Sequence, residues 1–344
     1  MNLDYPKAWK AMYLALAVVQ GLGRDFHRAR NLRAASFHKL ENFMATCGSR
    51  QALHMTTMSM PGISTNPELQ HFVYIDSTYA LQQAQRPGVD PPHANRLFDE
   101  LERETFRQAR HIFTVGEYVR ENVISHYGID PACVTAAGTG RGSIAPFDGT
   151  KNFEEAPILF VAKERFVEKG GILLLEAFRI AHARNPRLSL VMVAPPEFRG
   201  LIEGRPGVQF RTSLPWCELE ALFQQAALFA MPALYEPWGL VFLEALACKC
   251  PVLGMNRNAL PELTANGSFG FLIQEPTAEA IAEGLLDAFS DPERLRRMGD
   301  AGQAECLRRY TWKRTAEIIA NVLDGQRTGL KPIMSSATSK ESFE

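Results

Sequence analysis

The feature that most constrains the fold of this chain is the regular alternation of strand-like and helix-like segments from residue 157 onward. Residues 158–162 and 188–194 are short, uninterrupted apolar runs, which is typical of parallel strands buried on both faces. Between them, residues 171–183 carry apolar side chains at the spacing of one helical face. This order predicts a parallel sheet covered by helices, a Rossmann-like domain. The later segments are strands at 208–210, 228–232 and 251–254 and helices at 218–227, 240–248, 278–289, 292–310 and 312–323.

The first half of the chain carries segments of the same kinds with less regular spacing. A chain of 344 residues is longer than one hydrophobic core usually organises, so the sequence predicts two α/β domains. We expect an N-terminal domain over residues 1–150, a C-terminal domain over 151–330, and a disordered polar tail over 331–344. The predicted elements of the first half are strands at 71–75, 112–115 and 134–137, helices at 93–110 and 117–127, and an aperiodic linker at 142–157.

Charge and hydropathy narrow the class of protein. The net charge of −1 argues against a nucleic-acid partner, which would need a basic surface. No apolar run approaches the roughly 20 residues that span a bilayer, and residues 11–19 are predicted to form a buried helix, not a signal peptide. The basic residues 24–33 predict a solvated helix face, with peripheral contact to the inner face of a membrane as the alternative. Six scattered cysteines without zinc-like spacing fit a reduced, cytoplasmic protein, and nothing in the sequence defines its oligomeric state.

Two glutamates eight positions apart carry the strongest chemical signal. Glu236 follows a predicted strand, and Glu244 lies about two turns into a predicted helix. In open α/β sheets ligands bind at the carboxyl ends of the strands. Gly239 lets the backbone approach a ligand, and the free N–H groups of a helix start attract phosphate. Sugar hydroxyls could satisfy the carboxylates, but for a bare pair of glutamates a helix cap and an exposed side chain would be the better explanation.

The residues around this pair resemble a known family. Residues 231–254 closely resemble the donor-site motif of glycosyltransferase family 4, as do residues 260–272 and the Tyr310-Thr-Trp312 that opens the last helix. These are retaining enzymes of the GT-B fold, in which two Rossmann-like domains face each other across a cleft. The resemblance is strong over residues 157–323, thinner over 71–150 and very weak before residue 65.

The resemblance implies roles for the matching residues. Glu244 would bind the ribose hydroxyls of a nucleotide, Glu236 would hold hydroxyls of the donor sugar, and the amides of Gly239 and Leu240 would face the diphosphate. The last helix would cross back to the first domain, as is common in GT-B chains. The chain departs from the family pattern at three positions. Ala233 stands where serine is usual, and Lys249 and Asn258 stand where glycine is usual.

A basic loop follows the first strand of the C-terminal domain. Negative charge grows on a diphosphate as the sugar leaves, so cations in this place would favour the reaction. The resembling family has an arginine and a lysine here, and Lys169 matches the lysine. Spacing puts Lys163 at the position of the arginine, with Arg165 two residues further as the alternative. Alternating Lys and Glu residues in a loop are otherwise usually just solvated charge.

The chain contains no Asp-x-Asp pair, which the other major glycosyltransferase architecture uses to hold a divalent metal on the diphosphate. We therefore expect an enzyme without a metal or other cofactor, in which protein cations assist a UDP- or GDP-sugar donor. In the first half, Asp76 ends a predicted strand where many family members carry a histidine and a subset an aspartate. It would orient an acceptor hydroxyl or act as its base, and a plain turn residue is an equal alternative. Family members begin with a strand and a glycine-rich loop, so either the N-terminal domain lacks this first strand or Gly21-Leu-Gly23 stands in for the loop.

These observations predict a retaining, metal-independent glycosyltransferase of the hexosyltransferase type. It would move a sugar from a nucleotide-diphosphate sugar to a hydroxyl of a glycan, a lipid-linked sugar or a small molecule. The alternative is a catalytically weak or inactive GT-B protein that binds a nucleotide sugar or a partner chain.

Overall fold

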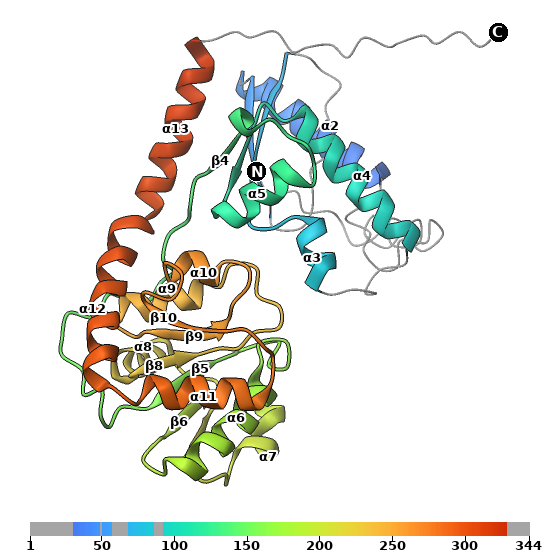
Figure 1. The fold of residues 1–344 in the computed structure, drawn as a ribbon. Helices are drawn as coiled ribbons and strands as arrows, with labels where there is room; N and C mark the ends of the chain where they lie inside the picture. Colours follow the sequence, from blue (N-terminus) through green and yellow to red (C-terminus); the bar gives the residue numbers. More distant parts are fainter. Residues whose placement is uncertain (1–29, 49, 57–67, 86–91, 329–344) are drawn as a thin grey trace.

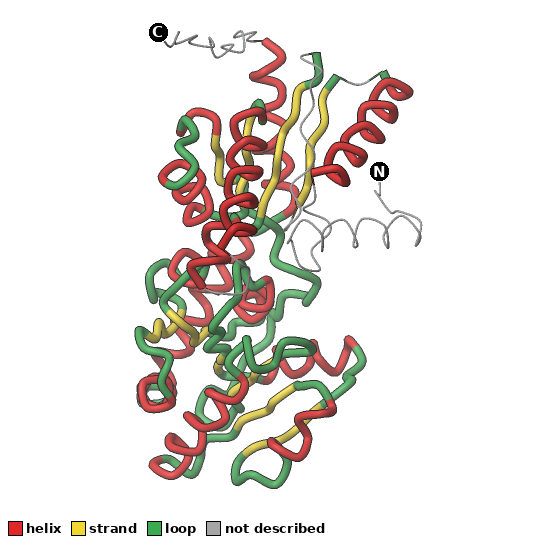
Figure 2. Tube along the Cα trace, turned by 90° about the vertical axis from the view of Figure 1, so that its right-hand side faces the viewer, coloured by secondary structure: helices red, strands yellow, loops and turns green. Residues whose placement is uncertain are grey.

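The computed structural model describes residues 30–48, 50–56, 68–85 and 92–328 (Figure 1). The described strands form two separate parallel sheets, one with the order β1-β2-β3-β4 and one with the order β10-β9-β8-β5-β6-β7. Figure 2 shows the two sets of strands, in yellow, toward opposite ends of the molecule. The predicted α/β class is therefore confirmed, and no strand is shared between the two sheets.

The first sheet belongs to the N-terminal part of the chain. Its central strands β2 and β3 are buried along most of their length, as expected for strands with helices on both sides. The sequence did not predict α2, β1 or α3, and the segments 11–19 and 21–23 lie outside the described residues. The elements are α2 (Arg30–Cys47), β1 (Gln51–Thr56), β2 (Gln70–Ile75), α3 (Tyr79–Gln85), α4 (Pro92–Gln108), β3 (His111–Thr114), α5 (Glu117–Ser125), η2 (Pro131–Cys133) and β4 (Val134–Ala136).

The second sheet lies in the C-terminal part and follows the predicted alternation closely. Strands β5, β6, β8 and β9 are buried throughout, which explains their uninterrupted apolar sequences. Strand β10 is an addition that the sequence did not predict. The elements are β5 (Ile158–Val161), α6 (Gly171–Arg184), β6 (Leu190–Val193), η3 (Pro196–Phe198), α7 (Arg199–Ile202), β7 (Val208–Arg211), α8 (Trp216–Gln225), β8 (Leu228–Ala230), α9 (Leu240–Ala247), β9 (Val252–Met255), α10 (Leu260–Leu263), β10 (Gly270–Ile273), α11 (Ala278–Ala288), α12 (Pro292–Arg309) and α13 (Trp312–Thr328).

The strand order of the second sheet determines where a ligand can bind. From β5 the chain adds β6 and β7 on one side, and it then returns to add β8, β9 and β10 on the other side. The neighbouring strands β5 and β8 therefore form the point at which the strand order reverses. Loops that leave such a pair diverge above and below the sheet and open a crevice at its carboxyl edge. The loops after β5 and β8 carry the basic residues and the first glutamate of the predicted site.

The last helix, α13, returns to the first domain, as predicted (Figure 1). It begins at Trp312, whose side chain packs against the loop that follows β4. A Cβ atom on Gly140 would lie 2.4 Å from the Trp312 ring, and one on Gly138 would lie 3.9 Å from Thr315 Oγ1. Close packing of this helix therefore requires glycine at residue 140.

Two further expectations concern membrane-spanning segments and the redox state of the cysteines. Among the described residues, none of the helices combines the length and the apolar character that crossing a bilayer requires. All six cysteines carry free thiols. The cytoplasmic location and the domain boundary at residues 150/151 stay predictions; the boundary falls in the segment between β4 and β5.

Candidate active site

Three predicted site residues meet above the reversal point of the second sheet. Lys169 Nζ lies 3.6 Å and Arg165 Nη2 lies 3.5 Å from the same Glu236 oxygen, Oε2. The two cations come from the loop between β5 and α6, and Glu236 comes from the loop between β8 and α9. The crevice is therefore lined by two cations that share one carboxylate.

Backbone geometry holds the two loops together. Gly170 has φ 79°, and a Cβ atom there would lie 2.1 Å from the carbonyl oxygen of Pro232. Arg165 has φ 54°, a left-handed conformation that costs a residue other than glycine about 1 kcal/mol. This turn directs the Arg165 side chain toward Glu236. Of the two alternatives that the sequence left open, Lys163 and Arg165, it is Arg165 that contacts Glu236, and its role stays a prediction.

Lys163 takes a different direction. Its Nζ lies 5.2 Å from the centroid of the Trp216 ring, in a cation–π contact at the start of α8. Lys163 is exposed, and it is close enough to Glu244 to favour the charged form of that carboxylate. It therefore flanks the crevice on the Glu244 side and does not join the Glu236 cluster.

Glu244 lies on α9, which begins after Gly239 in a left-handed conformation (φ 77°). Its Oε1 accepts a hydrogen bond of 3.1 Å from the backbone N–H of Ser143, in the segment that joins the two sheets. A Cβ atom on Gly142 would lie 2.5 Å from the same oxygen, so glycine is needed for this approach. Burial raises the pKa of Glu244, and the backbone N–H groups together with Lys163 and Lys169 oppose that rise. The carboxylate is thus held beneath the linker, near both lysines.

Asp76 faces the cluster from the first domain, directly after β2. Burial is the main cause that raises its pKa to about 6, and the negative charge of Glu236 adds to the rise. Its Oδ1 atom is buried and has no hydrogen-bond partner among the described residues. A buried carboxyl oxygen without a donor is costly, and a hydroxyl donor from a bound ligand would offset that cost.

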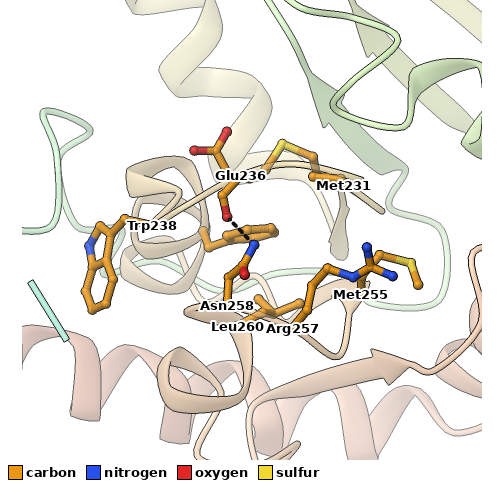
Figure 3. A pocket seen from close by; sticks show the side chains of 9 residues that line it. Met231, Glu236, Trp238, Met255, Arg257, Asn258 and Leu260 are labelled. Atoms are coloured by element: carbon orange, nitrogen blue, oxygen red, sulfur yellow. Dashed lines mark hydrogen bonds between the residues drawn. The ribbon is translucent and has the colours of Figure 1, made fainter. Parts of the chain in front are cut away.

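Other contacts across the cleft involve residues that the sequence motifs did not predict to meet. The side chain of Tyr118, on α5, contacts the carbonyl oxygens of Asp76 and Pro237. The amides of Gln85 and Asn258 bond to each other, and Asn258 Nδ2 also donates to the Glu236 carbonyl at 3.1 Å. Figure 3 shows this bond, with the Glu236 carboxylate directed away from Asn258. One signal in the sequence could have pointed to Tyr118 as a site residue. It lies in the first turn of a helix that follows the carboxyl end of a buried strand.

A pocket lies behind Glu236 at the carboxyl edge of the second sheet (Figure 3). Its walls are largely apolar, with Asn258 and Arg257 as the polar exceptions besides Glu236 itself. Such a mixture of apolar walls and a few polar groups is typical of small-molecule sites. The lining residues are Met231, Ala233, Glu236, Trp238, Phe242, Met255, Arg257, Asn258 and Leu260.

Two departures from the family pattern have a structural explanation. Lys249 and Asn258 replace glycines, and both have left-handed backbones, with φ 54° and 56°. Asparagine tolerates this conformation better than most residues, and its side chain here bridges Gln85 and the Glu236 carbonyl. Lys249 Nζ instead donates to the carbonyl oxygen of Gly149, at 3.0 Å. Both side chains therefore form contacts that glycine could not.

Comparison with known proteins shows a family match in the C-terminal part of the chain. Residues 146–305 match the family model described as glycosyl transferases group 1, which spans the second sheet, both site loops and α9. The match lies almost entirely within the C-terminal domain. The resemblance to glycosyltransferases of this kind is thus confirmed for that part of the sequence.

Curated relatives are similar over part of their length. Alpha-maltose-1-phosphate synthase of Mycolicibacterium smegmatis is 27% identical over 248 residues, which are 63% of this chain and 63% of that protein. D-inositol 3-phosphate glycosyltransferase of Streptomyces bingchenggensis is 27% identical over 269 residues, 70% of this chain and 58% of that protein. The chain thus matches less than two thirds of the length of either relative.

A solved structure shows the same fold. Sucrose-phosphate synthase of Thermosynechococcus elongatus superposes with a TM-score of 0.62 and 17% identity, covering 84% of this chain and 76% of that one. At this identity the likeness concerns the fold. Together with the two separate parallel sheets, it confirms the predicted GT-B fold class.

Proposed function

We propose that this protein is a retaining glycosyltransferase that moves a sugar from a nucleoside-diphosphate sugar to a hydroxyl group of an acceptor. The observation that carries the proposal is the convergence of Arg165, Lys169 and Glu236 at the reversal point of the second sheet. Cations and a carboxylate side by side match a donor that has a diphosphate next to a sugar. The match of residues 146–305 to the family model described as glycosyl transferases group 1 supports the same reaction.

On this proposal the donor lies along the second domain. Glu244 accepts hydrogen bonds from the ribose, and the amides of Gly239 and Leu240 at the start of α9 face the diphosphate, since a helix N-terminus favours negative charge. Glu236 holds hydroxyls of the sugar. The two cations contact Glu236 in the structure, and a bound diphosphate would give them a partner of higher charge.

Lys169 and Arg165 are assigned the stabilisation of the leaving group. As the bond from the sugar to the diphosphate breaks, negative charge grows on the phosphate oxygens, and a fixed cation stabilises that state more than the ground state. Asp76 contributes from the opposite wall. Its carboxylate orients the acceptor hydroxyl or accepts its proton, and Oδ1 is the atom available for that contact.

We also propose that the reaction needs no metal ion or other cofactor, because protein cations stand where the diphosphate charge develops. Turnover should then continue in EDTA at a rate within a few-fold of the untreated enzyme. Complete loss of turnover in EDTA, restored by Mg²⁺ or Mn²⁺, would show that a divalent ion takes part.

The first test is a thermal-shift panel of UDP-, GDP- and ADP-sugars. A donor at about 100 times its dissociation constant stabilises the folded protein by about 2.7 kcal/mol, which is readily measured. The stabilising donor is then incubated with and without acceptors, and proton NMR reads the anomeric configuration of the product, which should match that of the donor. Phosphorylated sugars are the first acceptors to try, because the names of the relatives include an inositol phosphate glycosyltransferase and a maltose-1-phosphate synthase.

The panel also separates this proposal from its alternative, a GT-B protein that binds a nucleotide sugar or a partner chain without turnover. Binding of a donor without hydrolysis or transfer would favour the alternative. If none of the donors bound, both the transferase and a protein that only binds a nucleotide sugar would be contradicted.

A further inference from the structure

The phenol of Tyr118 joins the two walls of the cleft at the candidate site. Its hydroxyl lies 3.3 Å from the carbonyl oxygen of Asp76, at the end of β2, and also donates to the carbonyl oxygen of Pro237. Pro237 directly follows Glu236 in the second domain. One hydroxyl group thus contacts both of the backbones that carry the two opposing carboxylates.

The ring of Tyr118 is fixed as firmly as its hydroxyl. It stacks on Trp238 with centroids 6.4 Å apart and planes inclined by 10°. Trp238 is buried, and a Cβ atom on Gly116, just before α5, would lie 2.4 Å from its ring. The ring therefore has little room to move without separating the domains.

The start of α5 is attached to the second domain by a further contact. The backbone N–H of Glu117 donates to Glu262 Oε2 at 2.7 Å, and the other oxygen of Glu262 accepts from Arg309 Nη2 at 2.8 Å. Glu262 thus caps a helix of the opposite domain, where a negative charge is favourable. The attachment places the first turn of α5, including Tyr118, against the donor-site loop.

We propose that Tyr118 is a positioning residue that sets the separation of Asp76 and Glu236 across the cleft, an inference that rests on the proposed function. Tyr118 contacts the backbone carbonyl of Asp76 itself and that of Pro237, the residue after Glu236, so a shift of the phenol moves both carboxylates. Two carboxylates that face each other repel, and a bridge between their backbones resists that repulsion. Misplacement of reacting groups by about 1 Å can lower a rate by about 100-fold.

The test is Tyr118→Phe, which keeps the ring and its stacking on Trp238 and removes only the bridging oxygen. Nucleoside diphosphate contacts the second domain alone on the proposed function, so its affinity should stay within twofold. Turnover at saturating donor should fall by about 10- to 100-fold. The matched control is Tyr127→Phe in the same domain. The Tyr127 hydroxyl donates to the buried Glu102, away from the cleft, so the control should lower the unfolding temperature and leave turnover within twofold.

A readout without activity separates this inference from the proposed function. Cys47 and Cys217 are exposed, one in each domain, so in a Cys133→Ser background they can carry a fluorescence donor and acceptor. Tyr118→Phe should broaden the transfer distribution toward longer separation, and Tyr127→Phe should not. An inactive parent enzyme would overturn the proposed function, whereas the distance shift would still support the bridge. Unchanged turnover with an unchanged distance distribution in Tyr118→Phe would overturn the inference. Should Tyr118→Phe not fold, Trp238→Leu replaces the aromatic stacking partner of Tyr118 by an aliphatic side chain, and the same two outcomes decide.

Discussion

The two walls of the cleft satisfy their charges in different ways. In the second domain, Arg165 and Lys169 both contact Glu236, so the wall is charged but internally paired. In the first domain, Asp76 is half-buried, its buried Oδ1 atom has no hydrogen-bond partner among the described residues, and its pKa is raised to about 6. The difference teaches that the cations of the second domain can release Glu236 and bind a charged ligand. The first domain instead holds one carboxyl group, Asp76, whose pKa lies close to neutral pH. Binding is therefore expected mainly from the second domain and acid–base chemistry from the first.

The largest effect is expected from Lys169→Ala, which removes a cation from the paired wall. Because this charge acts most strongly when the diphosphate leaves, turnover should fall by on the order of 100-fold or more, while the dissociation constant of the donor changes much less. Donor affinity should be measured directly, since Michaelis constants mix binding with later steps. Lys313→Ala is a suitable control, because Lys313 is exposed on α13. A turnover for Lys169→Ala within a few-fold of the parent would remove the assigned role.

The next effect concerns the opposite wall. If the charged form of Asp76 is the active one, the rate should fall as the pH drops through about 6, because protonation neutralises it. Besides burial, the negative charge of Glu236 raises this pKa, and the backbone N–H groups of Asp76 and Ser77 lower it. Tyr74 and Tyr118 are the neighbouring titratable groups whose own pKa values burial and the Asp76 charge raise. Asp76→Asn should lower the rate by about 100-fold and abolish this acid limb. The exposed Asp148→Asn serves as control, and an acid limb that persists in Asp76→Asn would assign it to another group.

A smaller effect distinguishes the stability of the two domains. His54 Nε2 and His71 Nδ1 lie 3.0 Å apart between β1 and β2. Burial lowers the pKa of His54, His71 and His111. The pKa values of His54 and His111 fall to about 4. Lowered pKa values mean that the unfolded chain binds more protons, so this stability is complete above pH 6.5 and is lost as the pH falls toward 4. Between pH 7 and 5 the loss is about 2 kcal/mol for a histidine with a pKa near 4.

Hydrogen exchange can locate that loss. Amides of β1–β3 should lose protection between pH 7 and pH 5, after correction for the intrinsic exchange rate, to a greater extent than amides of β5 and β6. Equal losses in both sheets would contradict the assignment to the histidines. His54→Leu should reduce the difference, because it removes one of the titrating rings.

The same division appears in what the sequence could predict. The C-terminal strands are buried on both faces, so their apolar runs were unambiguous, and the reversal between β5 and β8 follows from their order. Strand β1 was missed because it lies at the edge of its sheet and mixes polar with apolar residues, with Met55 65% exposed. Charged groups near Glu236 could be named, but the turn that directs Arg165 inward depends on a left-handed backbone that its residue type does not reveal. The role of Tyr118 depends on contacts between the two domains, and a local sequence pattern does not predict such contacts.

The most direct test of the division between the walls is a calorimetric titration of a nucleoside diphosphate, chosen from the thermal-shift panel, into the parent enzyme, Glu244→Gln and Asp76→Asn. Glu244→Gln replaces a charged acceptor for the ribose by a neutral one and should weaken binding by about tenfold, equivalent to about 1.4 kcal/mol. Asp76→Asn should leave the affinity within twofold, because Asp76 is assigned to the sugar and acceptor side. Weakening of the nucleotide by Asp76→Asn to the same extent as by Glu244→Gln, or unchanged affinity in Glu244→Gln, would contradict the account.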